Sequence, residues 1–275
     1  MSTIGKALTL LDMIAGMQHE AGLSELSRLG GLDKATTRRF LVQLERFGFL
    51  EQDEETRKYR IGAAPLRLAQ IREARLPLLQ HGIPMLRRLA ASCGETVHMS
   101  EFTAGRLSTI HAEESFRAHR VTVKVGTLLP LHASGSGLAY LAFSPPLLIE
   151  DYLSRPLERF TAHTIVETDA LRTLLAETRR LGYSVNRQGL EGGMISVAAP
   201  ILAPHKPPVG AVAIAAPLVR VDDRSIEALG GAVADTAAEL SGALYPSSDS
   251  SPPAFESRRR ATPAALALRE EATAP

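Results

Sequence analysis

The chain has no tryptophan, a single cysteine and no long apolar run, and each absence excludes a class of protein. Aromatic residues make up 5% of the chain, which argues against a surface that stacks the bases of single strands. Cys93 alone cannot form an intramolecular disulfide, which fits a reducing compartment. No segment approaches the roughly 20 apolar residues that span a membrane, and the N-terminus lacks a signal-peptide core. We therefore expect a cytoplasmic protein without membrane contact.

The chain also lacks an excess of charge of either sign, because 31 basic and 30 acidic residues give a net charge of +1. Any contact with nucleic acid must therefore come from a local patch of basic side chains. The length of 275 residues favours two domains, and 45% hydrophobic residues are ample for their cores.

The first 62 residues carry the pattern of a winged helix-turn-helix domain. Apolar spacing predicts helices over 4–17, 23–29 and 34–47, with Asp33 as the N-cap of the third. Two short strands, 49–52 and 58–61, flank a polar turn. In the third helix we expect five residues to face inward: Thr37, Phe40, Leu41, Leu44 and Phe47.

That spacing turns a group of basic and small residues of the third helix outward, where a recognition helix contacts DNA. Thr36 is short enough to approach a thymine methyl group, and Arg38 has the shape to bind a guanine edge. We expect phosphate contacts from Lys34 and Arg39 on the helix. Arg57 and Lys58 on the wing are expected to reach a neighbouring phosphate or the minor groove. The alternative is a small helical domain with ordinary solvated charges, since acidic residues also surround the wing.

The rest of the chain divides into a linker helix over 63–82, a mixed domain over 83–245 and a tail over 246–275 that we predict to be disordered. Pro77 and Pro84 are expected to interrupt the linker, so that a new helix begins near Pro84. In the mixed domain the pattern predicts strands at 96–100, 106–112, 121–125, 183–186, 194–200 and 209–215. Helices are expected at 134–143, 147–153, 170–181 and 225–244.

The order of motifs resembles the IclR family of bacterial regulators over residues 4–244. The matching segments are 34–41, 44–50 and 59–62 in the first domain, and 129–139, 182–193, 196–200 and 209–217 in the second. The resemblance implies an α+β protein, in which a GAF-like α/β effector-binding domain with an antiparallel sheet follows the winged helix. It also implies a double-stranded DNA operator, a small carboxylic or aromatic acid as effector, and a homodimer or a dimer of dimers.

Carried over position by position, the resemblance assigns the effector site to eight residues: Leu131, Gly135, Ser136, Asn186, Met194, Ser196, Ala213 and Ala215. Amides at Gly135 and Ser136 would meet a carboxylate, as free amides at a helix N-terminus do. Asn186 stands where relatives often have an acid, and Ala213 and Ala215 where they have serines. Leu138 stands where relatives often have a basic residue. The chain therefore has a less polar pocket, which suits a larger, partly apolar acid better than a two-carbon acid. Arg187 is a nearby candidate cation.

Other classes of site have weaker support in the sequence. Cys93, His98, His111 and His132 form no compact zinc motif, and we interpret the histidines as structural. Ser134 lacks the glycine that a nucleophile motif requires, and no phosphate-binding loop or zinc-protease motif occurs. We therefore expect no enzymatic activity and no cofactor. Two alternatives stay open, an enzyme with an accessory winged helix and a protein-interaction module.

Overall fold

The computed structural model describes residues 2–246 and divides the chain into two compact units. One unit ends at Leu76 and the other begins at Pro77. The boundary lies inside the predicted linker segment 63–82, at Pro77, one of the two prolines expected to interrupt it. The predicted tail lies outside the described residues from position 247 onward.

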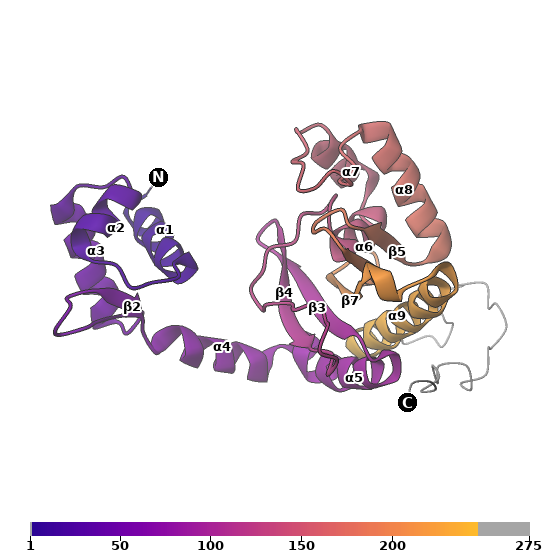
Figure 1. The fold of residues 1–275 in the computed structure, drawn as a ribbon, viewed down its shortest axis with the longest axis horizontal. Coiled ribbons are helices and arrows are strands. Elements are labelled where there is room, and N and C mark those ends of the chain that lie inside the picture. The colour runs from indigo at the N-terminus through magenta and orange to yellow at the C-terminus, as the bar shows by residue number, and fades with distance from the viewer. Residues whose placement is uncertain (1, 247–275) are drawn as a thin grey trace, which may run out of the picture. The chain divides into compact units, whose positions relative to one another are not determined.

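The N-terminal unit consists of four helices and a two-stranded antiparallel hairpin (Figure 1). Its core is formed by buried residues from three helices and both strands, including Leu10, Leu26, Phe40, Leu41 and Leu50. The order confirms the predicted helix-turn-helix followed by a hairpin. The elements are α1 (Thr3–Gly16), α2 (Leu23–Leu29), α3 (Lys34–Arg46), β1 (Leu50–Gln52), β2 (Tyr59–Ile61) and α4 (Ala64–Arg75).

Helix α3 begins where the sequence predicts, because the Asp33 side chain accepts a hydrogen bond of 2.8 Å from the Thr36 amide. This bond lowers the pKa of the Asp33 carboxyl below its ordinary value. Thr37, Phe40 and Leu41 are buried as expected. The prediction for Phe47 is wrong: its side chain is 67% exposed, because the helix ends at Arg46 and Phe47 is the C-cap residue.

The second unit is built around a five-stranded sheet in the order β4-β3-β7-β6-β5, with every neighbouring pair antiparallel. This confirms the antiparallel sheet that the resemblance implies. The strands are β3 (Thr96–Thr103), β4 (Arg106–Glu113), β5 (Ser184–Arg187), β6 (Met194–Ile201) and β7 (Gly210–Pro217). The helices are α5 (Pro77–Cys93), α6 (Gly135–Ala142), α7 (Pro146–Leu153), α8 (Thr168–Leu181), the 3₁₀ turn η1 (Leu218–Arg220) and α9 (Asp223–Leu244).

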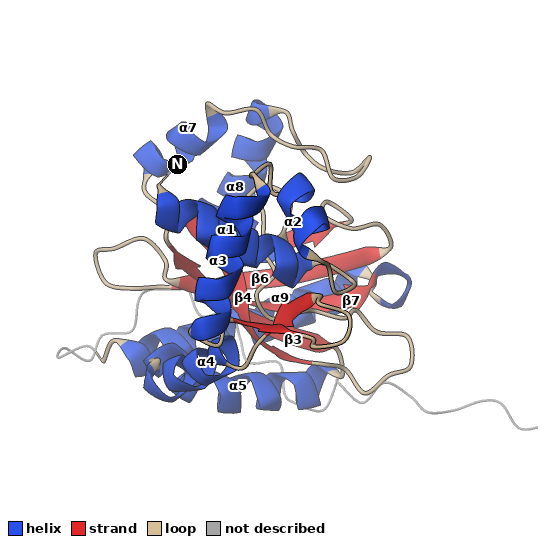
Figure 2. Cartoon of the chain, turned by 90° about the vertical axis from the view of Figure 1, so that its left-hand side faces the viewer, coloured by secondary structure: helices blue, strands red, loops and turns tan. Residues whose placement is uncertain are grey.

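Helices cover both faces of this sheet. Helices α5 and α9 pack against one face and against each other, below the sheet in Figure 1. Helix α6 lies on the other face, with α7 and α8 packed beyond it. In Figure 2 the strands lie between α5, below them, and α8, above them. Because both faces are covered, β6 and β7 are buried along nearly their whole length.

Two predictions in this unit are wrong. The helix expected to begin at Pro84 begins at Pro77 and contains Pro84, because Leu79, Leu86 and Leu89 bury its apolar face. The strand expected at 121–125 is a loop. The segment after it follows the edge of β4 instead: the Gly126 amide donates to the Thr109 carbonyl, and the Thr109 amide to the Thr127 carbonyl.

No helix among residues 2–246 combines the length and apolar character that crossing a bilayer would require.

Candidate functional site

The exposed side of α3 carries the basic residues that the sequence selects. Lys34, Arg38 and Arg39 are exposed, and Thr36 is half-buried in the first turn. Arg39 lies on the side of the helix opposite Thr37, Phe40 and Leu41, which are in the core, and Lys34 and Arg38 flank that buried face. The four candidates thus share the N-terminal half of α3, the part of a recognition helix that approaches base edges.

A groove runs between α2, α3 and the hairpin. Arg38 and Arg57 line it together with Gln52 and Tyr59. Glu45 lines the same groove, so that it is mixed in charge rather than uniformly basic. Burial, aided by the Glu45 charge, raises the pKa of the Tyr59 phenol. Arg38 and Arg57 therefore face one groove between α3 and the wing.

The turn between β1 and β2 presents Arg57 and Lys58 at its surface. Asp53 caps this turn by accepting from the Thr56 amide at 2.7 Å, which lowers the pKa of the Asp53 carboxyl. The Gln52 side chain donates to the Arg57 carbonyl at 2.9 Å. Arg57 has a φ of 56°, in the left-handed region. These bonds give the wing tip a defined shape and leave both basic side chains exposed.

The predicted effector residues on strands share one face of the sheet. The pairing aligns Asn186, Ser196, Ala215 and Thr96 as one row across β5, β6, β7 and β3. The next row is Ser184, Ala198, Ala213 and His98. Met194 lies on the same face, opposite Pro217. Helix α6 covers this face, and Ala139 packs on Ala198 and Ala213.

The N-terminus of α6 meets the sheet at these rows. The Gly135 amide donates to Ser196 Oγ at 3.2 Å, and the Gly137 amide donates to the Oγ of the N-cap residue Ser134 at 3.0 Å. A Cβ atom on Gly135 would lie 2.3 Å from Ser196 Oγ, so a glycine is required for this approach. A ligand carboxylate at Gly135 would compete with the Ser196 hydroxyl for the amide.

Two other predicted positions are already held by hydrogen bonds or packing. Asn186 Nδ2 donates to the Ala133 carbonyl at 3.0 Å, and Asn186 Oδ1 accepts from the Gly189 amide at 2.8 Å. Leu131 belongs to the core cluster around Leu138. Asn186 therefore fixes the loop before α6, in addition to any contact with a ligand.

Arg187 follows Asn186 on β5. Successive side chains of a strand point to opposite faces, so the Arg187 side chain lies on the other face of the sheet. It is exposed and pairs with Asp223 at 2.6 Å. It lines a cavity of about 250 Å³ with His132, His163 and Leu174. Asn186, which pairs with Ser196, also lines this cavity, so the cavity adjoins the predicted effector residues at β5.

His98 is the buried polar residue whose position the sequence interpretation missed. Its ring is 5% exposed, and Nε2 lies 3.3 Å from Ser136 Oγ in the first turn of α6. Burial lowers the pKa of His98 to about 4, so the ring is neutral at neutral pH. The signal in the sequence is the alternation of the polar residues Thr96, His98 and Ser100 with the apolar residues Val97 and Met99.

The four residues considered as zinc ligands have separate hydrogen-bond partners. His132 bonds to Tyr152 Oη at 2.7 Å and to the Glu158 carbonyl at 2.8 Å, and His111 bonds to Glu113 at 2.8 Å. Cys93 Sγ lies 3.9 Å from the Ala90 carbonyl. Within the part of the chain that the structure describes, no three His, Cys, Asp or Glu side chains are arranged to hold a metal ion.

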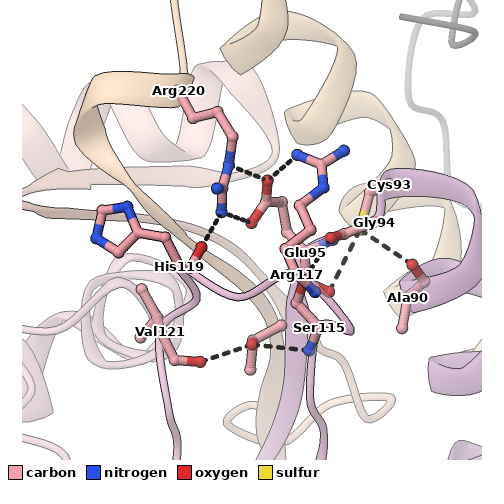
Figure 3. A network of polar contacts seen from close by, with 10 residues as sticks. Ala90, Cys93, Gly94, Glu95, Ser115, Arg117, His119, Val121 and Arg220 are labelled. Carbon is pink, nitrogen blue, oxygen red and sulfur yellow. Dashed lines mark hydrogen bonds and ion pairs between the residues drawn. The ribbon is translucent and has the colours of Figure 1, made fainter. Parts of the chain in front are cut away.

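An ion-pair network fixes the loop after β4 beside the same sheet face (Figure 3). The buried Glu95 carboxylate accepts two bonds from Arg220, at 2.8 and 2.9 Å, and one from Arg117 at 2.8 Å. The neighbouring Thr96 hydroxyl donates to the Val121 carbonyl at 2.6 Å and accepts from the Ser115 amide at 3.1 Å. Since Thr96 shares a row with Ser196, the loop borders the predicted effector site.

Comparison with known proteins gives matches over both units. The family model described as the IclR helix-turn-helix domain matches residues 3–54. The model described as the C-terminal domain of bacterial transcriptional regulators of the IclR type matches residues 73–242. The two matches occur in the same order as the two units, and the second alone covers more than half of the chain.

Individual relatives agree with these matches. The transcriptional repressor IclR of Escherichia coli is 31% identical over 243 residues, which cover 86% of this chain and 88% of the repressor. A solved IclR transcriptional regulator from Silicibacter sp. TM1040 is 36% identical, with a TM-score of 0.76 and coverage of 87% and 95%. An IclR homologue from Microbacterium hydrocarbonoxydans, solved with 4-hydroxybenzoate, is 25% identical, with a TM-score of 0.76 and coverage of 88% and 99%.

Proposed function

Because the chain belongs to the IclR family of DNA-binding transcriptional regulators, which are not enzymes, we propose that α3 is its recognition helix. The observation that carries this proposal is the cluster of exposed residues on the N-terminal half of α3, namely Lys34, Arg38 and Arg39, with Thr36 beside them. The groove lined by Arg38 and Arg57 supports a role of the wing in the same interface. A protein that binds operator DNA acts in the bacterial cytoplasm.

Two arginines of α3 have different proposed roles. Arg38 reads a guanine edge, because it lines the groove between α3 and the wing, and its planar group can form two parallel bonds. Arg39 is the next residue of α3 and is exposed to solvent, so its proposed partner is a phosphate. Lys34, Arg57 and Lys58 add further phosphate contacts, and Thr36 contacts a base.

We predict that Arg39→Ala weakens binding to operator and to unrelated duplexes alike, and lowers the slope of log affinity against log salt by about 1 per bound α3. Arg38→Ala should instead reduce the preference for operator over unrelated DNA by roughly tenfold or more, because one base contact contributes about 1–3 kcal/mol. Fluorescence anisotropy with the DNA upstream of the gene, at several salt concentrations, measures both.

The matched control is Arg106→Ala, which removes the same charge from the exposed β3–β4 turn of the second unit. Its salt slope should equal that of the unchanged protein. Equal affinity and equal slope for all three variants would contradict the placement of α3 on DNA. A stable protein complex without salt-sensitive DNA binding would instead favour the protein-interaction module.

The second unit is proposed to bind a small organic acid that controls DNA binding. Support comes from the family and from the homologue solved with 4-hydroxybenzoate. In this chain the predicted site has Ser136 on α6 and Ser196 and Asn186 on the sheet face beneath it, with alanines at 213 and 215. This composition favours a carboxylate bound near Ser196 and an apolar body beside the alanines.

We also propose that the protein is a homodimer or a dimer of dimers, as the family resemblance implies. Two helices of the N-terminal unit expose apolar side chains: Ile4 and Leu8 on α1, and Leu66, Leu68 and Ile71 on α4. In α4 only Ala64 is buried. An exposed apolar surface of this extent on an isolated chain is typical of an association site.

We predict that Leu66→Asp raises the dissociation constant of this dimer by at least about tenfold, because a charge in an apolar interface loses its hydration. Sedimentation or light scattering over a range of protein concentrations measures the shift toward monomer. Leu147→Asp is the control, since Leu147 is also an exposed leucine, at 86% against 65% for Leu66, and lies on α7 in the other unit. A mass that does not change in the Leu66 variant would exclude α4 from the interface.

A further inference from the structure

Arg57 at the tip of the wing combines an unusual backbone conformation with an unpaired side chain. Its φ of 56° lies in the left-handed region, where the Cβ atom of any residue other than glycine crowds a neighbouring carbonyl oxygen. The side chain is exposed, and among the described residues its guanidinium makes no hydrogen bond or ion pair. A glycine at this position would therefore give the free protein the same turn with less strain.

Several hydrogen bonds hold the wing tip in this conformation. The Gln52 side chain donates to the Arg57 carbonyl at 2.9 Å, and the Arg57 amide donates to the Asp53 carbonyl at 3.0 Å. The Asp53 carboxylate accepts from the Thr56 amide at 2.7 Å and from the Thr56 hydroxyl at 2.8 Å. The direction in which the Arg57 side chain leaves the backbone is thus fixed before any partner binds.

The Arg57 side chain lines the groove between α3 and the wing together with Arg38. Burial and the Glu45 charge raise the pKa of the Tyr59 phenol, whereas the charges of the two arginines act in the opposite direction. Both guanidinium groups are therefore within electrostatic reach of the same phenol oxygen. They concentrate positive charge at one part of a groove that is otherwise mixed in charge.

Arg60 of the same hairpin has the opposite arrangement. Its guanidinium pairs with Glu51 at 3.2 Å and with Glu20 at 3.5 Å. Acidic side chains of the N-terminal unit thus neutralise Arg60 and leave Arg57 for an anion from outside the chain.

We propose that Gln52 is a positioning residue of the DNA interface, which holds Arg57 in its left-handed conformation and directs the guanidinium toward a backbone phosphate of the bound duplex. This inference rests on the proposed placement of α3 on DNA. A guanidinium forms charge-assisted hydrogen bonds with phosphate oxygens, and fixing it in advance reduces the conformational entropy lost on binding. The strain in the free wing is thus offset by stronger binding to DNA.

Replacement of Arg57 by glycine should have opposite effects on stability and on binding. Arg57→Gly removes the crowded Cβ atom, so the N-terminal unit should melt at the same temperature or up to about 5 °C higher. Affinity for duplex DNA should fall roughly tenfold at low salt, and the slope of log affinity against log salt should fall by about 1 per bound wing. Differential scanning calorimetry and fluorescence anisotropy with the DNA upstream of the gene measure the two effects.

The role of Gln52 is tested in two backgrounds. Gln52→Met keeps the length of the side chain and removes its donor, and it should weaken DNA binding by about threefold or more. In the Arg57→Gly background the carbonyl of residue 57 remains, so Gln52→Met should still lower the melting temperature there. Its effect on DNA affinity in that background should be less than about twofold, because the side chain that Gln52 positions is gone.

Ala104→Gly is the matched control for the relief of strain. Ala104 has a φ of 50° and is exposed in the β3–β4 turn of the second unit. This substitution should leave both the DNA affinity and the salt slope unchanged.

The possible outcomes are distinguishable. Unchanged affinity and slope in Arg57→Gly, with both lowered in Arg39→Ala, would overturn the phosphate contact of the wing and leave α3 on DNA. An equal loss of affinity from Gln52→Met in both backgrounds would overturn the positioning role, since Gln52 would then act independently of Arg57. A lower melting temperature of Arg57→Gly would contradict the strain in the free wing. Absence of salt-sensitive DNA binding in the unchanged protein would overturn both this inference and the proposed function of α3.

Discussion

Leu41→Ala is expected to lower the free energy of unfolding of the N-terminal unit by about 2–5 kcal/mol, as for other buried leucines. Leu41 is fully buried in α3 and belongs to the cluster that holds α1, α2, α3 and the hairpin together. A unit of this size is stable by only about 5–10 kcal/mol, so the loss is a large part of the total. Operator binding should therefore fall steeply with temperature in this variant.

Hydrogen exchange measured by mass spectrometry of the full chain is the suitable method, because it resolves the two units and the chain has no tryptophan for fluorescence. Exchange should accelerate in peptides before Leu76 and stay unchanged in the sheet of the second unit. Val42→Ala is the matched control, since Val42 is the next residue of α3 and is 44% exposed. Equal exchange in both variants would show that Leu41 is not part of the core.

The second large effect is expected at Gly137 in the first turn of α6. A Cβ atom there would lie 2.4 Å from the Pro130 carbonyl oxygen and 2.5 Å from Leu131 Cα. Both are backbone atoms, so neither can rotate away as a side chain could. Gly137→Ala must displace either the loop before α6 or the helix itself, at a cost of about 1–3 kcal/mol or more.

This displacement should also impair effector binding, because Gly135 and Ser136 are in the same turn and contact Ser196 and His98. Thermal unfolding followed by circular dichroism, together with acid titration, measures both effects. Gly231→Ala is the control: Gly231 is exposed in the middle of α9 and has no atom within 4 Å of an added Cβ. It should stabilise the protein by about 0.5–1 kcal/mol, since alanine favours a helix over glycine. A Gly137 variant that melts like the unchanged protein would contradict the packing of this turn.

Helix ends were well predicted wherever one residue marks the end. Asp33 caps α3 through its side chain, Ser134 caps α6 in the same way, and Gly182 ends α8 in the left-handed conformation with a φ of 83°. Such signals depend on two to four neighbouring residues, so the sequence contains all the information that they need. The exposed basic residues of α3 could be named for the same reason.

The predictions that failed depended on distant contacts. Pro84 lies inside α5 because the helix buries its apolar face on the sheet and on α9. Residues 121–125 form a loop, since the segment after them bonds to the edge of β4. None of these outcomes is encoded within a short window of sequence.

The sequence by itself determined the order of elements, the two-part organisation and the family, because periodicity, caps and collinear motifs are local or additive properties. It also named eight effector positions by resemblance. Only the tertiary structure decided which polar groups meet on the sheet face beneath α6. His98 and Thr109 are separated along the chain and become diagonal neighbours through the register of β3 and β4. Strand register and burial arise from pairing between distant segments. They place His98 Nε2 beside Ser136 and leave His98 Nδ1 buried without a hydrogen-bond partner among the described residues.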